Sequence, residues 1–196
     1  MTTSTADGKV FDVRIALPRT GVSIEGIWRP NDAERFASWE MCVELATRVP
    51  VIPLRKDEGL LSELLTSLYT QFGNVRTVLR RHGPDVAQSR RGELNFALLA
   101  GHLLNQVLRP VLAYWHPRLE SWMDKKQEGV GRIEHERDFG DFELLREFLL
   151  VDLRSDLLEF TDAFAKASGG NEFVRVQLDN EDRLYSHFSR LRARGG

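Results

Sequence analysis

The longest apolar stretch of the chain, residues 94–116, places the strongest constraint on the fold. Its sequence is LNFALLAGHLLNQVLRPVLAYWH, in which leucine or valine recurs at almost every helical turn. Six polar residues interrupt it: Asn95, His102, Asn105, Gln106, Arg109 and His116. At about 100° per residue on a helix, these residues fall within an arc of roughly 100°. The pattern predicts a central helix with one polar stripe, against which the other elements pack.

This stretch is long enough for a membrane span, which needs about 20 residues. However, Arg109, His102 and the three amide side chains of the stripe would be costly in hydrocarbon. The N-terminal sequence MTTSTADGK also lacks the apolar region of a signal peptide. We therefore expect a cytoplasmic protein without a membrane partner. The net charge of −2 provides no general attraction for nucleic acid.

Two prolines are expected to interrupt the central helix. Pro110 lacks an amide hydrogen and clashes with the preceding turn, which predicts a kink near residues 106–110. Pro117 follows Trp115 and His116, and it favours a break followed by a short new helix with the sequence PRLESWMDKKQ.

The N-terminal region predicts a β-hairpin followed by a helix. Residues 10–17 and 22–28 alternate apolar and polar side chains across a Pro-Arg-Thr-Gly turn, as hairpin strands do. Asn31 and Glu34 have the spacing of a capping box. The helix that they open should run to about Arg48, with an apolar stripe formed by Phe36, Trp39, Val43 and Ala46. The segment VPVIPL, residues 49–54, is expected to be extended over the core.

Apolar residues at three- and four-residue steps predict two more long helices. One runs from about Glu58 to Arg81, and the other from about Arg132 or Asp141 to Ala167. The outer face of the second is acidic, with Glu143, Glu147, Asp152, Asp156, Glu159 and Asp162. The predicted fold is mainly α, a bundle of four main helices with an N-terminal β-hairpin over residues 10–170. Residues 1–9 are expected to be disordered, and residues 171–196 to form an appendage with a short strand over 172–178 and a basic helix over 182–194.

Motifs of metal, nucleotide and hydrolase chemistry are absent from the sequence. None of the five histidines follows a glutamate by three residues, and no HExxH or Cys/His zinc pattern occurs. Glycine-rich phosphate loops and the GxSxG elbow are missing as well. We expect no metal and no cofactor. The single cysteine, Cys42, should pack as a small apolar residue.

One enzymatic pattern fits the chain. Helical-bundle RNases of the HEPN type use an arginine followed, after four to six residues, by a histidine at a helix end. Arg109 and His116 match with six intervening residues, and Arg76 and His82 with five. Such a pair would orient a phosphate and shuttle a proton. Pro110 departs from the polar residue that these sites place after the arginine.

The polar stripe allows a structural and a functional interpretation. In the first, Arg109 pairs with an acid of a neighbouring helix, because a buried arginine without a partner is strongly destabilising. The candidate acids are Glu40, Glu44, Asp152 and Asp156. In the second, the stripe is a binding site, including a pocket for a small ligand beside the Pro110 kink. The candidate binding residues are His102, Asn105, Arg109, Trp115 and His116.

Three stretches resemble a set of uncharacterised bacterial helical proteins, which carry ELxTR, SLY and LRPxxxxWH helices in this order. The stretches are Glu44-Leu45-Ala46-Thr47-Arg48, Ser67-Leu68-Tyr69, and Leu108-Arg109-Pro110 with Trp115-His116. The resemblance covers about residues 36–165 and brings no assigned activity. It implies an accessory role near mobile or defence genes, and it directs attention to Arg109, Trp115 and His116.

These features predict a non-catalytic protein-interaction module, an accessory component of a bacterial, defence-related multi-protein system. Three features favour an interaction module. The chain lacks a catalytic motif, its hairpin needs a surface to rest on, and its acidic and basic regions are separated. The expected partner is another protein or a second copy of the chain. An HEPN-like RNase and a small-ligand sensor remain the alternatives, and we expect a nucleic-acid partner only for the RNase.

Overall fold

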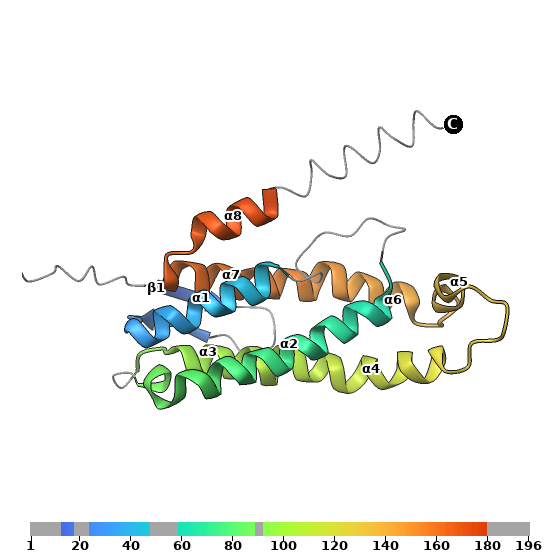
Figure 1. Ribbon diagram of the computed structural model, residues 1–196, viewed down its shortest axis with the longest axis horizontal. Helices are drawn as coiled ribbons and strands as arrows, with labels where there is room; N and C mark the ends of the chain where they lie inside the picture. Colours follow the sequence, from blue (N-terminus) through green and yellow to red (C-terminus); the bar gives the residue numbers. More distant parts are fainter. Residues whose placement is uncertain (1–12, 18–23, 48–58, 89–91, 180–196) are drawn as a thin grey trace, which may run out of the picture.

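The computed structural model of the protein describes residues 13–17, 24–47, 59–88 and 92–179. Within these ranges the chain is mainly helical, and its long helices lie along the longest dimension of the molecule (Figure 1). Several sequence predictions fall outside the described residues: the N-terminal segment 1–9, the turn at 18–21, the extended segment 49–54 and the basic helix over 182–194.

The N-terminal strands pair with each other and rest on the start of the central helix. Strand β1 (Val13–Leu17) runs antiparallel to β2 (Ile24–Trp28), in a register that places Val13 opposite Trp28. The amide of Leu94 donates a hydrogen bond of 3.1 Å to the carbonyl of Ile27. A Cβ atom at Gly26 would lie 2.9 Å from Cγ of Leu94, so this close approach requires glycine.

Helix α1 (Asp32–Ala46) begins at the predicted capping box. The side chain of Asn31 accepts a hydrogen bond from the amide of Glu34, and the Glu34 carboxylate accepts one from the amide of Asn31. The predicted apolar stripe was largely wrong, since Phe36 is 68% exposed and Trp39 is 43% exposed. The buried face instead includes Ala37, Ser38, Met41, Cys42 and Leu45. Small residues on this face allow α1 to pack along α7.

Helix α2 (Leu61–His82) agrees with the predicted helix to within three residues at each end. Its buried face follows the predicted stripe, with Leu61, Leu64, Leu65, Leu68 and Val75. The helix stops at Gly83, whose φ of 61° favours glycine. A short 3₁₀ segment, η2 (Gly83–Ala87), follows.

The central helix is longer than predicted and contains a wide turn. Helix α3 (Phe96–His102), the π-helical turn η3 (Leu103–Leu108) and helix α4 (Arg109–Met123) follow one another directly. The irregularity thus lies immediately before Pro110, where the amide of Arg109 donates to the carbonyl of Leu104, five residues earlier. The predicted break at Pro117 was wrong. Pro117 and Ala113 are both exposed, so solvent can hydrate the carbonyl that loses its partner.

The predicted acidic helix is also continuous and contains a second π turn. After α5 (Arg132–Arg137), the chain forms α6 (Phe142–Glu147), η4 (Phe148–Leu153) and α7 (Arg154–Ser168). Helix α7 ends at Gly169, whose φ of 79° is left-handed and whose amide donates to the carbonyl of Ala165. This helix returns antiparallel to the central helix, with α5 at the end where the chain reverses (Figure 1).

The strand predicted over residues 172–178 was wrong, because these residues lie in helix α8 (Asn171–Asp179). Phe173, Val174 and Gln177 are the half-buried positions, which is helical rather than strand spacing. The ring of Phe173 packs 5.1 Å from the ring of Trp39 on α1. The contact with Trp39 therefore favours a helix where the local alternation of residues indicated a strand.

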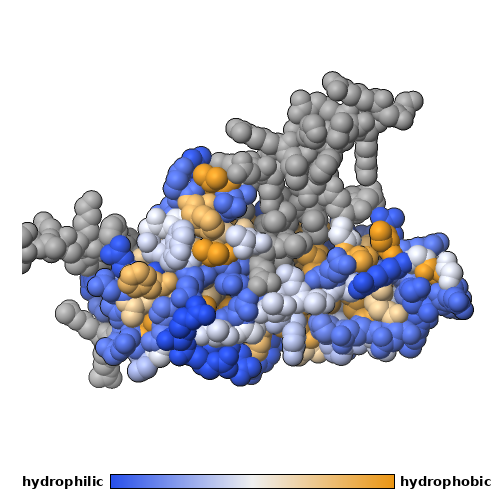
Figure 2. Space-filling view, in the orientation of Figure 1, coloured by the Kyte–Doolittle hydropathy of each residue, from blue (hydrophilic) through white to orange (hydrophobic). Residues whose placement is uncertain are grey.

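The helix from Phe96 to Met123 is long and apolar enough to cross a membrane, but half of its apolar window is buried inside the fold. A core helix of a globular domain meets the same criterion. Figure 2 shows that the face in view is mostly hydrophilic, with hydrophobic residues in several separate spots, one of them over α8.

Candidate functional site

The predicted polar stripe divides into a buried part and an exposed part. Asn95 is buried as the N-cap of α3, where it accepts a hydrogen bond of 2.8 Å from the amide of Leu98. His102 is also buried, with its ring 6.1 Å from that of Phe160, and burial lowers the pKa of its imidazole. Asn105 and Arg109 are exposed. A π turn contains more residues than an α-helical turn. The side chains that follow η3 therefore point in other directions around the helix axis than they would in a regular α-helix.

Arg109 does not form the buried pair that the structural interpretation requires. Within the described part of the chain it has no hydrogen bond or ion pair. Two of its candidate partners bind other groups. Glu40 lies 2.6 Å from Arg81 and 3.0 Å from His82, and Glu44 accepts a hydrogen bond of 2.6 Å from Asn74.

Trp115 and His116 lie near the end of the polar stripe on α4, where Trp115 is buried and His116 is half-buried. The Trp115 ring is buried in the core, 4.8 Å from the exposed ring of Tyr114. His116 lies 3.2 Å from the carboxylate of Glu120 and 5.7 Å from the ring of Tyr69 on α2. No described contact joins His116 to Arg109, so the structure does not assemble the two into a common cleft.

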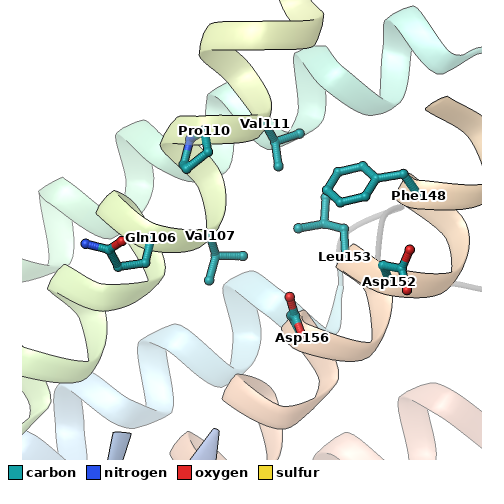
Figure 3. Close-up of a pocket in the computed structure, with 8 residues that line it drawn as sticks. All are labelled: Gln106, Val107, Pro110, Val111, Phe148, Asp152, Leu153 and Asp156. Carbon is teal, nitrogen blue, oxygen red and sulfur yellow. The ribbon is translucent and has the colours of Figure 1, made fainter. Parts of the chain in front are cut away.

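An open groove lies between the central helix and the η4–α7 region. It has a volume of about 620 Å³. Its lining comes from two segments far apart in sequence: Gln106, Val107, Pro110 and Val111 on one wall, and Phe148, Asp152, Leu153 and Asp156 on the other. In Figure 3 the side chains of Val107, Val111, Leu153 and Phe148 point into the space between the two helices, whereas Gln106 points away. We call this hollow the π-turn groove.

The local structure of the chain explains the shape of the π-turn groove. Each wall contains one π turn, because Gln106 and Val107 belong to η3 while Phe148, Asp152 and Leu153 belong to η4. The central helix packs on α2 and α7 packs on α1, which leaves the two walls apart on this side. π turns are rare, and they occur frequently at functional sites.

The groove has an apolar floor and an acidic rim. Val107, Val111 and Leu153 are buried at the floor, Phe148 and Asp156 are half-buried, and Asp152 is exposed. The lining contains two carboxylates and no lysine, arginine or histidine. Tyr114 and Leu144, each four residues from a lining residue, are also exposed apolar side chains.

The sequence indicated one wall of this groove and not the other. The Pro110 kink predicts a pocket beside the central helix, and Asp152 and Asp156 belong to the predicted acidic helix face. Their spacing of four residues places both carboxylates on one side of the helix. The pairing of that side with residues 106–111 depends on contacts between distant segments, for which the sequence contains no signal.

Within the described residues, the two carboxylates of the π-turn groove do not belong to a larger cluster of metal-ligand side chains. Among the residues that the structure describes, no group of three or more His, Cys, Asp or Glu side chains could hold a metal ion. Two smaller hollows occur elsewhere. One of about 370 Å³ lies between α1 and α2, and one of about 130 Å³ lies beside His116.

Two buried carboxylates, Glu34 and Glu136, position the elements around the groove. Glu34 accepts hydrogen bonds of 2.9 Å from Nε1 of Trp28 and of 2.9 Å from the amide of Phe96. Glu136 accepts bonds of 2.7 and 2.9 Å from the amides of Leu61 and Ser62, at the start of α2. The sequence predicted only the capping box for Glu34 and no role for Glu136.

Cys42 is fully buried, as its apolar surroundings predicted. Burial raises the pKa of its thiol from 9.0 to about 11. The unfolded chain therefore loses this proton first, so the contribution to stability is complete below about pH 9 and declines as the pH rises towards 11. We expect melting temperatures to fall more between about pH 8 and pH 10 in the native protein than in Cys42→Ala. Equal falls in the two proteins would contradict this expectation.

No protein-family model, curated protein or solved structure matches this chain. The resemblance to bacterial helical proteins with ELxTR, SLY and LRPxxxxWH helices therefore stays a prediction.

Proposed function

We propose that the protein is a non-catalytic protein-interaction module, and that its π-turn groove binds a basic amphipathic helix of a protein partner. The observation that carries this proposal is an apolar groove floor beside the carboxylates of Asp152 and Asp156. In this proposal the chain is a bundle of four main helices with an N-terminal β-hairpin. It acts in the bacterial cytoplasm as an accessory component of a defence-related multi-protein system.

The dimensions and chemistry of the groove suit a helix. Both walls are helical, and a third helix laid between them would place its apolar face on Val107, Val111 and Leu153. Lysine or arginine residues along one flank of that helix would lie beside Asp152 and Asp156. A small ligand would be less enclosed, because typical ligand pockets bury most of the surface of the ligand and Asp152 and Pro110 lie on an exposed rim.

The side chains in the groove also favour binding over catalysis. Among the eight lining residues, the two aspartates are the only side chains that could act as a nucleophile or general base, and no serine, threonine, cysteine, lysine or histidine accompanies them. Arg109 and His116, the candidates for RNase chemistry, are not among these lining residues. Accordingly the proposal assigns the groove no bond-making step.

Peptide binding tests the proposal. We expect the protein to bind a synthetic amphipathic peptide of leucine and lysine, about 14 residues or four turns long, and its leucine–glutamate counterpart at least about tenfold more weakly. Asp152→Lys should weaken binding of the lysine peptide by about tenfold at low salt, because attraction becomes repulsion. Fluorescence anisotropy with labelled peptides measures both differences, and added salt should reduce them.

Glu143→Lys provides the matched control, since Glu143 is exposed on α6 and does not line the groove. This variant has the same change of charge as Asp152→Lys, and it should bind the lysine peptide almost as the native protein does. Equal affinities for the two peptides, or equal losses in the two variants, would overturn the proposal. Cleavage of single-stranded RNA that is lost in His116→Ala would support the HEPN-like RNase instead.

A further inference from the structure

The chain itself contains a sequence with the properties of the expected partner helix. Residues 182–194 read DRLYSHFSRLRAR and lie outside the described residues. Leu184, Phe188 and Leu191 have the spacing of one helix face. Arg183, Arg190 and Arg194 have the spacing of a flank beside it. We call residues 182–194 the basic tail.

The basic tail complements the π-turn groove in both polarity and charge. When the tail lies in the groove as a helix, its apolar face would contact the floor formed by Val107, Val111 and Leu153. The arginines at 190 and 194 are four residues apart, as are the aspartates at 152 and 156 on one wall of the groove. Helix residues four apart are neighbours on one side, so two matching pairs of opposite charge face each other when the tail lies in the groove.

The position of α8 favours docking between two copies of the chain. Helix α8 packs against α1 and α7, and in Figure 1 α7 lies between α8 and α4. Only residues 180 and 181 connect Asp179 to the first residue of the tail at position 182, a span of at most about 11 Å. That reach is about the diameter of one helix with its side chains. It is too short to carry the whole tail around α7 and lay it along the groove of the same chain.

We propose that the basic tail of one protomer docks in the π-turn groove of a second copy, and that the reciprocal contact closes a two-fold symmetric dimer. This inference rests on the proposed function, because it assigns the groove its helical ligand. An isologous arrangement uses the same two surfaces twice, so no tail or groove is left to propagate a filament. The groove and tail of one chain are then sufficient for assembly.

Charge exchange tests the tail and the groove together. The native chain is expected to have twice its mass of 22.5 kDa by light scattering after gel filtration. The double change Asp152→Lys with Asp156→Lys in the groove, and the double change Arg190→Glu with Arg194→Glu in the tail, should each weaken the dimer by at least about tenfold. Glu143→Lys with Glu147→Lys, at two exposed positions outside the groove lining, should remain dimeric. Circular dichroism of each variant verifies that it is folded.

Mixing the two charge variants then distinguishes docking between chains from docking within one chain. In the mixed pair, the groove of the Asp152→Lys, Asp156→Lys variant receives the tail with two glutamates, and the native groove of the tail variant receives the native arginine tail. The mixture should therefore form a mixed dimer in which both contacts are attractive, whereas docking within one chain would leave each variant monomeric. Native mass spectrometry identifies the mixed species by its mass.

The outcomes separate this inference from the proposed function. If the native chain is monomeric and the leucine–lysine peptide still binds its groove, the inference fails and the proposed function stands. If the tail variant binds the peptide more tightly than the native chain and the mixture gives no mixed dimer, the tail occupies its own groove and docking between copies is refuted. If the peptide does not bind and the chain is monomeric, both proposals fail.

Discussion

Glu34→Ala is expected to lower the free energy of unfolding by about 3–5 kcal/mol. The side chain is 1% exposed, and its carboxylate accepts hydrogen bonds from the Trp28 indole and from the amides of Asn31 and Phe96. Alanine would leave these donors without their acceptor, and a buried donor without a partner costs about 1–3 kcal/mol. Urea unfolding followed by circular dichroism measures the change.

The effect should extend beyond α1, because Glu34 connects three separate elements. Trp28 belongs to β2, Asn31 caps α1, and Phe96 begins α3. Glu128→Ala is the control, since Glu128 is exposed in the loop after α4 and should change stability by no more than about 0.5 kcal/mol. A loss in Glu34→Ala as small as in this control would show that the carboxylate has no structural role.

Glu136→Ala should have the second-largest effect, a loss of about 2–3 kcal/mol. Leu60, at the N-cap of α2, provides no side-chain cap. Glu136 replaces that cap from α5, with bonds of 2.7 Å to the amide of Leu61 and 2.9 Å to that of Ser62. Its negative charge also interacts favourably with the N-terminal end of the helix dipole.

Two measurements identify this effect as the loss of a cap. Urea unfolding gives the free energy, and hydrogen exchange should be faster at the amides of Leu61 and Ser62 than in the native protein. Glu134→Ala is the matched control, because Glu134 lies exposed on the same helix and makes neither contact. Unchanged exchange at the start of α2 would contradict the role given to Glu136.

Both carboxylates matter for the candidate site because they fix the helices around it. Glu34 ties the start of the central helix to α1, which packs along α7. Glu136 connects α5 to α2. Along the chain, α5 lies between the central helix and the η4–α7 region, which form the two walls of the groove. Since the π-turn groove is the space between the central helix and η4–α7, its width depends on these connections.

Local signals in the sequence were sufficient for most helix boundaries. The Asn31–Glu34 capping box, Gly83 and Gly169 each act within a few residues of the helix end that they define. Their effect arises from backbone hydrogen bonds and dihedral angles, which depend on the nearby sequence. The mainly helical character of the chain follows from such signals and from apolar periodicity.

Predictions failed where the structure of a segment depends on packing against elements that are distant in the sequence. The buried face of α1 was misassigned because α7 packs on the side with small residues. Residues 172–178 form a helix, with Phe173 packed against Trp39. Pro117 is accommodated within α4 because that side of the helix is exposed. In each case, the structure was determined by packing against another element or by exposure to solvent, and not by the conformational preference of the local sequence.

The sequence by itself determined the mainly helical character of the chain, the position of Pro110 and the acidic character of residues 143–162. Only the tertiary structure decided that the π turns lie on facing walls and that Asp152 and Asp156 border an apolar floor. It also decided the roles of Glu34 and Glu136, whose partners lie 62 and 75 residues away. The physical reason is that a cap or a turn depends on adjacent residues, whereas a groove or a buried carboxylate depends on which distant segments meet.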